Sequence, residues 1–360
     1  MKRCTKCILP ENYPGIKFNE EGVCNYCTTY KERKYQGSEA LSAKINSILK
    51  NKKNINKNYD CVVGLSGGRD SSYLLYFLVK VLNLRVIAYS IDHGFIPEQT
   101  KLNIKNMTDI LNVKLVIEEI DNLKKCLKHH ILSWMHHPSP AMVGVLCTGC
   151  RYNMYSRIRN FARKNKILFV FLGGHPFETQ YYKFDIMKIN PNNTSRKKYL
   201  FVMGYLSQII RNPKWVLNFK CLIEQIKEFY YYYPIRIKKS ETLTISPCES
   251  YIRWDEKIVI STLKNKLNWK EYPNVKSTSR GDCEVALLKL YLYKKTLGFN
   301  DKDDDFSSLI RANQISREEA LERLKKEEIS EEVVREIFEK IGLNFAALKR
   351  ALRQITERQA

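Results

Sequence analysis

The chain has 360 residues, 44% of them hydrophobic, which is enough for one large domain with appendages or for two ordinary domains. No run of about eighteen apolar residues occurs and the first residues lack an apolar core, so we expect a cytoplasmic protein without a transmembrane segment or a signal peptide. The net charge of +23 suits a nucleic acid, an anionic membrane surface or an anionic small substrate, although lysines spread over solvated faces would give the same total.

Two CxxC pairs define a unit at residues 1–30. CTKC supplies Cys4 and Cys7, CNYC supplies Cys24 and Cys27, and a turn-rich linker joins them. Pairs with this spacing, each giving two sulfurs to a tetrahedron, are typical of a structural zinc site. Because so short a segment has little core of its own, zinc (Zn²⁺) would supply most of its folding free energy. The sequence therefore predicts a zinc knuckle.

Residues 31–58 are polar and rich in lysine, and they predict a helical linker. In residues 59–250, apolar runs alternate with helical patterns; the runs cover 61–65, 85–91, 114–120 and 167–174. Short apolar runs between helices are typical of buried parallel strands. The pattern predicts an α/β fold, a doubly wound parallel sheet covered on both faces.

The segment at residues 188–240 is basic and aromatic. It contains eleven Lys or Arg against two Glu, interleaved with runs such as WVLNF and EFYYYYP. An insertion that contacts a partner, a membrane surface or RNA would have this composition. So would a helical hairpin whose aromatic side chains pack inside while its lysines stay solvated.

Residues 251–360 predict a helical region. Ser316 and Glu319 have the spacing of a capping box at the start of one helix, and residues 330–342 and 344–355 carry apolar side chains at helical intervals. The region is therefore expected to form a small bundle.

The loop after the first predicted strand reads DCVVGLSGGRDSSY, residues 60–73. It lies where ligands bind in such sheets, at the carboxyl end of a strand and the start of a helix. Gly67 and Gly68 let backbone amides approach an anion, and Ser66, Ser71 and Ser72 add hydroxyl donors. We interpret the loop as a phosphate cradle, although it is neither a Walker A loop nor a GxGxxG loop.

SGGRDSS resembles the SGGxDS loop of PP-loop ATP pyrophosphatases, a superfamily with a HUP-like fold. The resemblance implies that ATP is split between its α and β phosphates and that Asp70 holds Mg²⁺. The strand ending at AYSIDHG would face adenine, and GGHPFET at 173–179 looks like a later strand end of the active site. The ATP-binding residues implied are Ser66, Gly67, Gly68, Arg69, Asp70, Ser71, Ser72, Ser90, Gly173 and Gly174.

Over nearly its full length, the chain resembles the N-acetyl sugar amidotransferases of surface polysaccharide synthesis. The motifs are the zinc knuckle, the loop, CTGC, YIRWDEKIVISTLKNKLNW, STSRGDCE and LIRANQISREEALERL. The resemblance implies an ATP-dependent ligase that converts the acetamido group of a nucleotide sugar or nonulosonic acid, of the kind used in lipopolysaccharide O-antigen, into an acetamidino group. A separate glutaminase subunit would supply the ammonia. One departure is Asn313, where a glycine is expected.

The chemistry follows from the weakness of an amide as an electrophile. Adenylation of its carbonyl oxygen creates an imidate from which ammonia displaces AMP, and the protein mainly positions the reactants. His175 is a candidate for handling a proton or a phosphate oxygen, although a structural role is also open. Arg280 is a second catalytic candidate. Glu178 is a weaker candidate for a second carboxylate on the metal, and the favoured alternative is a plain polar residue at a helix start.

Arg253, Trp254 and Asp255 are predicted to bind the substrate. An arginine can grip a carboxylate or phosphate, and a tryptophan can lie against a sugar ring. The alternative is that Trp254 belongs to the core and that the arginines are paired surface groups.

Cys147 and Cys150 of CTGC, with Cys283 or Cys248 as a third ligand, suggest a second metal site. A second zinc, an iron–sulfur cluster or a pair of reduced thiols all fit this pattern. His129, His130, His136 and His137 show no metal-binding spacing and are predicted to lie in a loop.

A different class of function also fits the basic charge and the two kinds of CxxC pair. A tRNA-modifying PP-loop enzyme, either a thiolase or a lysidine-type ligase, would share both features. Such an enzyme would bind tRNA with an affinity that falls steeply with salt. We rank it second, so that nucleic acid is a less favoured partner than a small sugar.

Overall fold

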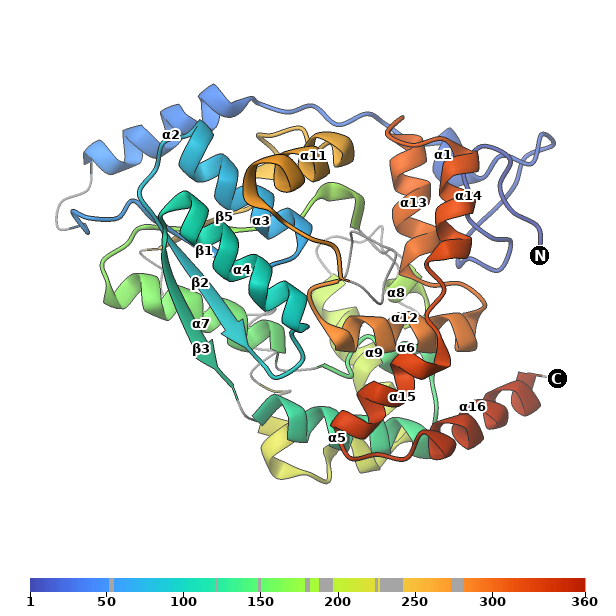
Figure 1. Cartoon of the computed structure of the whole chain (residues 1–360). Helices are drawn as coiled ribbons and strands as arrows, with labels where there is room; N and C mark the ends of the chain where they lie inside the picture. Colours follow the sequence, from blue (N-terminus) through green and yellow to red (C-terminus); the bar gives the residue numbers. More distant parts are fainter. Residues whose placement is uncertain are drawn as a thin grey trace.

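The computed structural model describes residues 1–51, 55–120, 122–147, 150–178, 182–187, 197–223, 226, 242–272 and 281–359. Its strands form a parallel sheet in the order β3-β2-β1-β4-β5 (Figure 1). Their bounds are β1 Cys61–Gly64, β2 Val86–Asp92, β3 Lys114–Glu119, β4 Phe169–Leu172 and β5 Leu243–Ile245. The predicted α/β class and parallel sheet are confirmed, and β5 is a strand that the sequence analysis did not predict.

Helices cover both faces of the sheet. They are α3 (Arg69–Tyr76), which continues as the π-helix η1 (Phe77–Val81), α4 (Glu98–Leu111) and α7 (Cys150–Lys164). Val63 and Phe171 belong to the core cluster that includes α3 and α4, whereas Val62 and Val170 join a second cluster with Ile158 of α7. Because alternate strand residues are buried on opposite faces, the strands read as continuous apolar runs in the sequence.

The amino-terminal and carboxyl-terminal segments lie together. The elements are α1 (Asn25–Thr28), α2 (Ser38–Asn51), α11 (Glu256–Leu267), α12 (Glu284–Leu297), α13 (Asp301–Arg311), α14 (Arg317–Lys326), α15 (Glu331–Lys340) and α16 (Phe345–Gln359). Figure 1 shows α1 beside α13 and α14. Arg3 pairs with buried Asp303 at 2.7 Å, and the Tyr13 hydroxyl donates to Asp304 at 3.0 Å. Ser316 caps α14 by accepting from the Glu319 amide, which is the serine half of the predicted capping box, while the Glu319 side chain pairs with Arg323.

The middle of the chain adds α5 (Asn122–His136), α6 (Pro140–Val143), η2 (Pro176–Glu178), α8 (Tyr182–Asp185), α9 (Lys197–Arg211), η3 (Pro213–Val216) and η4 (Pro247–Glu249). The loop predicted for the histidines was wrong, because His129, His130 and His136 lie on α5. His130 is fully buried, its Nδ1 lies 3.0 Å from the Leu146 carbonyl oxygen, and burial lowers its pKa to about 4. The histidine therefore belongs to the packing of this helix.

Asn313 follows α13 with a φ of 55°. Glycine adopts this left-handed conformation most easily, and asparagine tolerates it better than most residues. The position at which a glycine was expected thus keeps the backbone shape that a glycine would have. Among the described helices, none is long and apolar enough to cross a membrane.

Candidate active site

The loop between β1 and α3 is closed by its own serines. The Ser71 hydroxyl accepts from the Ser66 amide at 3.1 Å and lies 3.0 Å from the Ser66 hydroxyl, while the Gly68 amide donates to Ser66 Oγ at 3.3 Å. The Ser72 hydroxyl donates to the Gly68 carbonyl oxygen at 2.7 Å. Helix α3 begins at Arg69, so the partial positive charge of its amino terminus lies at this loop.

The glycines are required by close contacts. Gly67 has a φ of 78°, and a Cβ there would lie 2.6 Å from Thr100 Cγ2. A Cβ on Gly173, which follows β4, would lie 2.7 Å from the backbone nitrogen of Ser71. The end of β4 therefore approaches the start of α3 so closely that Gly173 has no room for a side chain, and α4 leaves none at Gly67.

Residues near the carboxyl-terminal helices contact the same loop. Trp269 Nε1 donates to the Gly67 carbonyl oxygen at 3.0 Å, and a Cβ on Gly68 would lie 2.9 Å from Oδ2 of Asp282. The Thr100 hydroxyl donates to the Gly281 carbonyl oxygen at 3.0 Å. Sequence reasoning missed Trp269 and Asp282, because nothing in their own motifs shows that they fold onto a loop some 200 residues earlier.

Asp70, the predicted magnesium ligand, is fixed by two donors. Trp254 Nε1 donates to Oδ1 at 2.9 Å, and Arg69 Nε donates to the same oxygen at 3.3 Å. The second oxygen, Oδ2, lies 3.8 Å from His175 Nε2. Ligand atoms of Asp70, His175 and Glu178 lie within 4.8 Å of one another. Carboxylate oxygens are the ligands that Mg²⁺ prefers, so Asp70 and Glu178 fit this ion.

His175 lies in this cluster with 5% of its surface exposed. Its ring stacks on Trp254 with 4.0 Å between centroids, and its Nε2 lies 3.5 Å from Glu178 Oε1. Burial would lower the pKa of His175, and Arg69 acts in the same direction, but Asp70 and Glu178 outweigh both and raise that pKa. Among the described residues, no hydrogen-bond partner reaches the buried Nδ1.

The Arg69 side chain is buried in a network of charges. Its Nη1 donates to Glu256 at 2.7 Å, its Nη2 lies 3.1 Å from His175 Nε2, and its guanidinium lies 4.7 Å from the Trp254 ring centroid. Arg323 donates to the other oxygen of Glu256 at 2.5 Å. The Arg69 side chain is only 3% exposed and is bound to these partners. Its contact with ATP remains a prediction.

The predicted substrate-binding residues are brought only partly together. Trp254 is fully buried against both His175 and Arg69, so in this conformation it supports Asp70 and offers no open face to a sugar. Arg253 is exposed, and Asp255 caps α11 by accepting from the Ile258 amide at 3.1 Å. Arg280 lies outside the described residues.

Two further ATP-binding predictions lie within or just after a strand. Ser90 is buried in β2, with 2% of its surface exposed. Gly174 follows β4 with a φ of 138°, and a Cβ there would have no neighbour within 4 Å. Both roles remain predictions.

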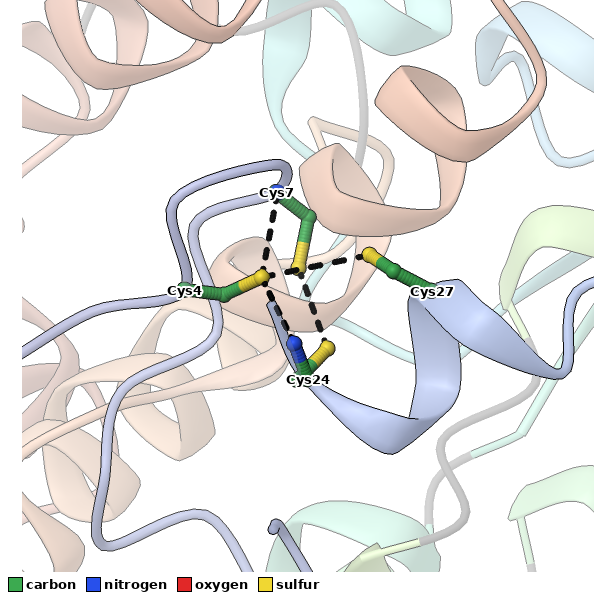
Figure 2. A group of neighbouring side chains, drawn as sticks. All are labelled: Cys4, Cys7, Cys24 and Cys27. Atoms are coloured by element: carbon green, nitrogen blue, oxygen red, sulfur yellow. Dashed lines mark hydrogen bonds between the residues drawn. The ribbon is translucent and has the colours of Figure 1, made fainter. Parts of the chain in front are cut away.

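Cys4, Cys7, Cys24 and Cys27 converge in a buried cluster (Figure 2). Their sulfurs lie within 4.8 Å of one another, and the amides of Cys7 and Cys24 donate to Cys4 Sγ at 3.4 and 3.2 Å. Hydrogen bonds from Cys24 and Cys27 lower the pKa of the Cys7 thiol, which favours the thiolate. Four sulfurs so arranged fit a structural zinc ion.

The carboxyl-terminal helices hold this knuckle. Arg317, the first residue of α14, donates to the carbonyl oxygens of Cys4 and Cys7 at 3.2 and 3.1 Å. Arg311 of α13 lies with its Nη1 4.0 Å from Cys7 Sγ. A knuckle with little core of its own thus gains packing from helices about 300 residues later.

The second cysteine group, predicted as a second metal site, differs from the knuckle in its geometry. Among the described residues, Cys147, Cys150 and Cys283 do not form a three-ligand cluster of the kind found at the knuckle. Lys289 Nζ donates to Cys147 Sγ at 3.6 Å, and burial raises the pKa of the Cys283 thiol to about 12, with help from Asp282 and Cys147. A second metal there remains a prediction.

Two protein families match the chain. A PP-loop domain matches residues 38–171, and the carboxyl-terminal domain of LPS biosynthesis proteins of the WbpG-like type matches residues 268–360. This chain contains a PP-loop domain and a WbpG-like carboxyl-terminal domain. The pairing agrees with the resemblance to N-acetyl sugar amidotransferases, and it supports an ATP-dependent enzyme of lipopolysaccharide biosynthesis.

No curated protein matches this PP-loop enzyme. Among solved structures, the NH3-dependent NAD synthetase from Campylobacter jejuni is 13% identical, with a TM-score of 0.29 over 56% of this chain and 95% of that one. The U34-tRNA thiolase NcsA from Methanococcus maripaludis, with its 4Fe-4S cluster, is 15% identical, with a TM-score of 0.33 over 92% and 90%. At these scores the likenesses carry no argument about the reaction.

Proposed function

We propose that this PP-loop enzyme is an amidotransferase that acts on an N-acetylated sugar. The carbonyl oxygen of the acetamido group attacks the α-phosphorus of ATP, and pyrophosphate leaves. Ammonia then adds to the carbon of the O-adenylated imidate, AMP leaves with the former carbonyl oxygen, and a proton is released to give the acetamidino group. No covalent bond to the enzyme is needed, so the protein acts by positioning and by charge stabilisation.

The loop would bind the pyrophosphate through its amides and hydroxyls. Mg²⁺, when bound at Asp70, would neutralise charge on the phosphates. The Asp70 carboxylate is oriented for this role by Trp254, and Arg69 keeps Trp254 and His175 in place. His175 would exchange a proton or hold a phosphate oxygen at Nε2, the ring nitrogen that faces Asp70.

One observation carries the choice of a sugar substrate. Trp269 and Asp282, which contact the loop at Gly67 and Gly68, both lie in the segment that matches the LPS biosynthesis family. The domain associated with lipopolysaccharide therefore borders the candidate ATP site. A sugar bound at this border would have its acetamido oxygen near the α-phosphate, with Arg253 and Arg280 as the proposed grips for an anionic substituent.

The remaining expectations are proposals of the same kind. They are a zinc ion in the knuckle, a separate glutaminase as the source of ammonia, cytoplasmic activity, and the division at residues 1–30, 31–58, 59–250 and 251–360. A second metal at the middle cysteines would be zinc or an iron–sulfur cluster.

The test is a pyrophosphate-release assay with purified protein, ATP, Mg²⁺ and ammonium. Nucleotide sugars with an N-acetyl group and nonulosonic acids are compared with bulk tRNA. We expect one sugar to stimulate release and to yield a product lighter by the difference between O and NH. Release stimulated by tRNA alone would overturn the substrate assignment and favour tRNA modification.

A further inference from the structure

An exposed apolar surface lies on α9 and the segment that follows it. Ile210, Leu217 and Phe219 are 80%, 75% and 72% exposed, more than any other large apolar side chain among the described residues. Met203 and Leu206 are also exposed, and their spacing from Ile210 places all three on one side of α9. We call these five residues the apolar surface. Exposed large apolar side chains concentrated in one stretch of the chain are unusual, and they mark an interaction site.

The charged residues of this segment have one sign. Residues 197–220 contain five Lys or Arg and no Asp or Glu. Of these, Arg211, Lys214 and Lys220 are exposed. An amphipathic helix with aliphatic and aromatic side chains on one face and only basic charges around them is typical of a helix that lies in the interface of an anionic bilayer. Protein interfaces, by contrast, are depleted in lysine.

An open groove continues the apolar surface toward α5 and α16. Its volume is about 540 Å³, and Leu217 and Lys214 line it together with Leu132, Arg350 and Ala351. Lys214 Nζ lies 3.4 Å from His136 Nδ1, another lining residue. The groove thus combines an apolar wall with basic groups. These complement the two parts of a phospholipid, since the apolar wall can contact the acyl chains and the basic groups can contact the phosphate.

Buried neighbours hold the exposed side chains outward. Trp215, between Ile210 and Leu217 in the sequence, is fully buried and stacks on His130 with 5.1 Å between centroids and 2° between ring planes. Asn212 Nδ2 donates to the Ser133 carbonyl oxygen at 2.6 Å. The segment is therefore fixed to α5, and its most apolar residues are left on the outside of this packing.

We propose that the apolar surface and the adjoining groove bind the surface of membranes that contain anionic phospholipids. Attachment is peripheral: side chains of the apolar surface enter the acyl boundary, and Arg211, Lys214 and Arg350 contact lipid phosphates. The electrostatic part of the affinity falls with salt, and the apolar part does not. The inference does not depend on which sugar the enzyme uses.

The test is sedimentation of the full-length protein with vesicles. Vesicles of phosphatidylcholine mixed with phosphatidylglycerol are compared with vesicles of phosphatidylcholine alone. We expect preferential binding to the anionic vesicles, weakened by added salt. The double variant Ile210→Glu, Leu217→Glu should bind at least about tenfold more weakly, because each substitution removes a large aliphatic side chain from the interface.

Leu102→Glu is the matched control, since Leu102 is an apolar side chain on α4 that is 52% exposed, and this variant should bind vesicles as the unmodified protein does. Thermal unfolding verifies that all variants fold. Equal vesicle binding by the double variant, or no binding by the unmodified protein, would overturn the proposal. A dimer in solution that the double variant disrupts would also overturn the proposal, because it would assign the surface to a second copy of the chain. RNA binding that is lost in Lys214→Glu but kept in the double variant would overturn it as well, because it would assign the basic residues to RNA.

Discussion

Asp70 is a carboxylate with one oxygen held and the other directed toward His175. Trp254 and Arg69 both donate to Oδ1, and Oδ2 lies 3.8 Å from the imidazole. This arrangement suits a residue that must present one oxygen to a metal in a fixed direction. The resemblance supplied Asp70 as a ligand, whereas only the folded chain shows what orients it.

Replacing Asp70 with Asn should therefore remove catalysis and leave the fold intact. The amide oxygen of Asn can still accept from Trp254, but the charge that would hold Mg²⁺ is gone. We expect pyrophosphate release to fall by at least about a hundredfold, the effect typical of losing one electrostatic contact in an active site. Asp109→Asn, on the exposed side of α4, is the matched control. Unchanged release by Asp70→Asn, at equal thermal stability, would rule out the role proposed for this residue.

Asp304 on α13 gives the protein a pH dependence of stability. Burial raises the pKa of this carboxyl to about 8, although Arg311 opposes the effect. An unfolded aspartate has a pKa near 3.9. Between about pH 4 and about pH 8 the folded state thus binds more protons at this residue than the unfolded state, so its contribution to stability is full at the acid end and declines as pH rises.

Asp304→Asn cannot ionise, and it should lose this decline. The melting temperature of the variant, relative to that of the unmodified protein, should increase steadily as pH rises from about 5 to about 8. Thermal unfolding at several pH values measures the difference, with Asp109→Asn as the control. A difference that is constant across this range would contradict the assigned pKa direction.

At the level of elements, Glu256 joins α3, α11 and α14. It accepts from Arg69 at 2.7 Å and from Arg323 at 2.5 Å, and its side chain is 3% exposed. Removing one partner of a buried charge pair leaves the other uncompensated, which typically costs about 3–5 kcal/mol. Glu256→Gln should therefore lower the free energy of unfolding by about this amount, as measured by urea denaturation.

Glu319→Gln is the control for this prediction, because Glu319 pairs with the same Arg323 but its side chain is 37% exposed. An exposed pair contributes at most about 1 kcal/mol. If the two variants lose the same stability, the Glu256 network does not fix these helices as we infer.

The sequence predicts the elements whose signal is local. β1, β2 and β4 are almost wholly buried, so each produces an apolar run that can be recognised in isolation, whereas β3 lies at the sheet edge and is only partly buried, yet its Leu115–Ile117 run is still apolar. β5 is three residues long, with Leu243 exposed, and exists because it pairs with β4. Helix α5 does carry a helical pattern at Leu127, Ile131 and Trp134, which the clustered histidines obscured.

The candidate site also divides into residues with a local sequence signal and residues that only distant contacts bring together. The loop could be predicted because its glycines and serines are consecutive and lie between a strand and a helix. The partners of Arg69 could not, since Glu256 is 187 residues away and nothing in either neighbourhood indicates the other. For Trp254 the sequence left a sugar-binding and a core position open, and the structure buries it; a tryptophan in a polar motif looks the same in both settings.

At the level of the whole molecule, the knuckle and the loop are connected through α14. Arg317 at the start of this helix donates to the carbonyl oxygens of Cys4 and Cys7, and Arg323 two turns later donates to Glu256, which holds Arg69 at the loop. A disordered knuckle would release one end of α14. Zinc would thereby support a site in which it takes no chemical part.

Loss of zinc should therefore lower both stability and activity. We expect the purified protein to hold at least one zinc ion per chain, bound at the four-thiolate site. Cys24→Ser should lose the metal, melt at a lower temperature and release pyrophosphate more slowly, whereas Cys126→Ser, at a buried core cysteine outside the knuckle, should keep its zinc. Metal analysis, thermal unfolding and the pyrophosphate assay follow the three effects. A zinc-free Cys24→Ser variant with full activity would show that the loop functions independently of the knuckle, despite the contacts of α14 with the knuckle and with Glu256.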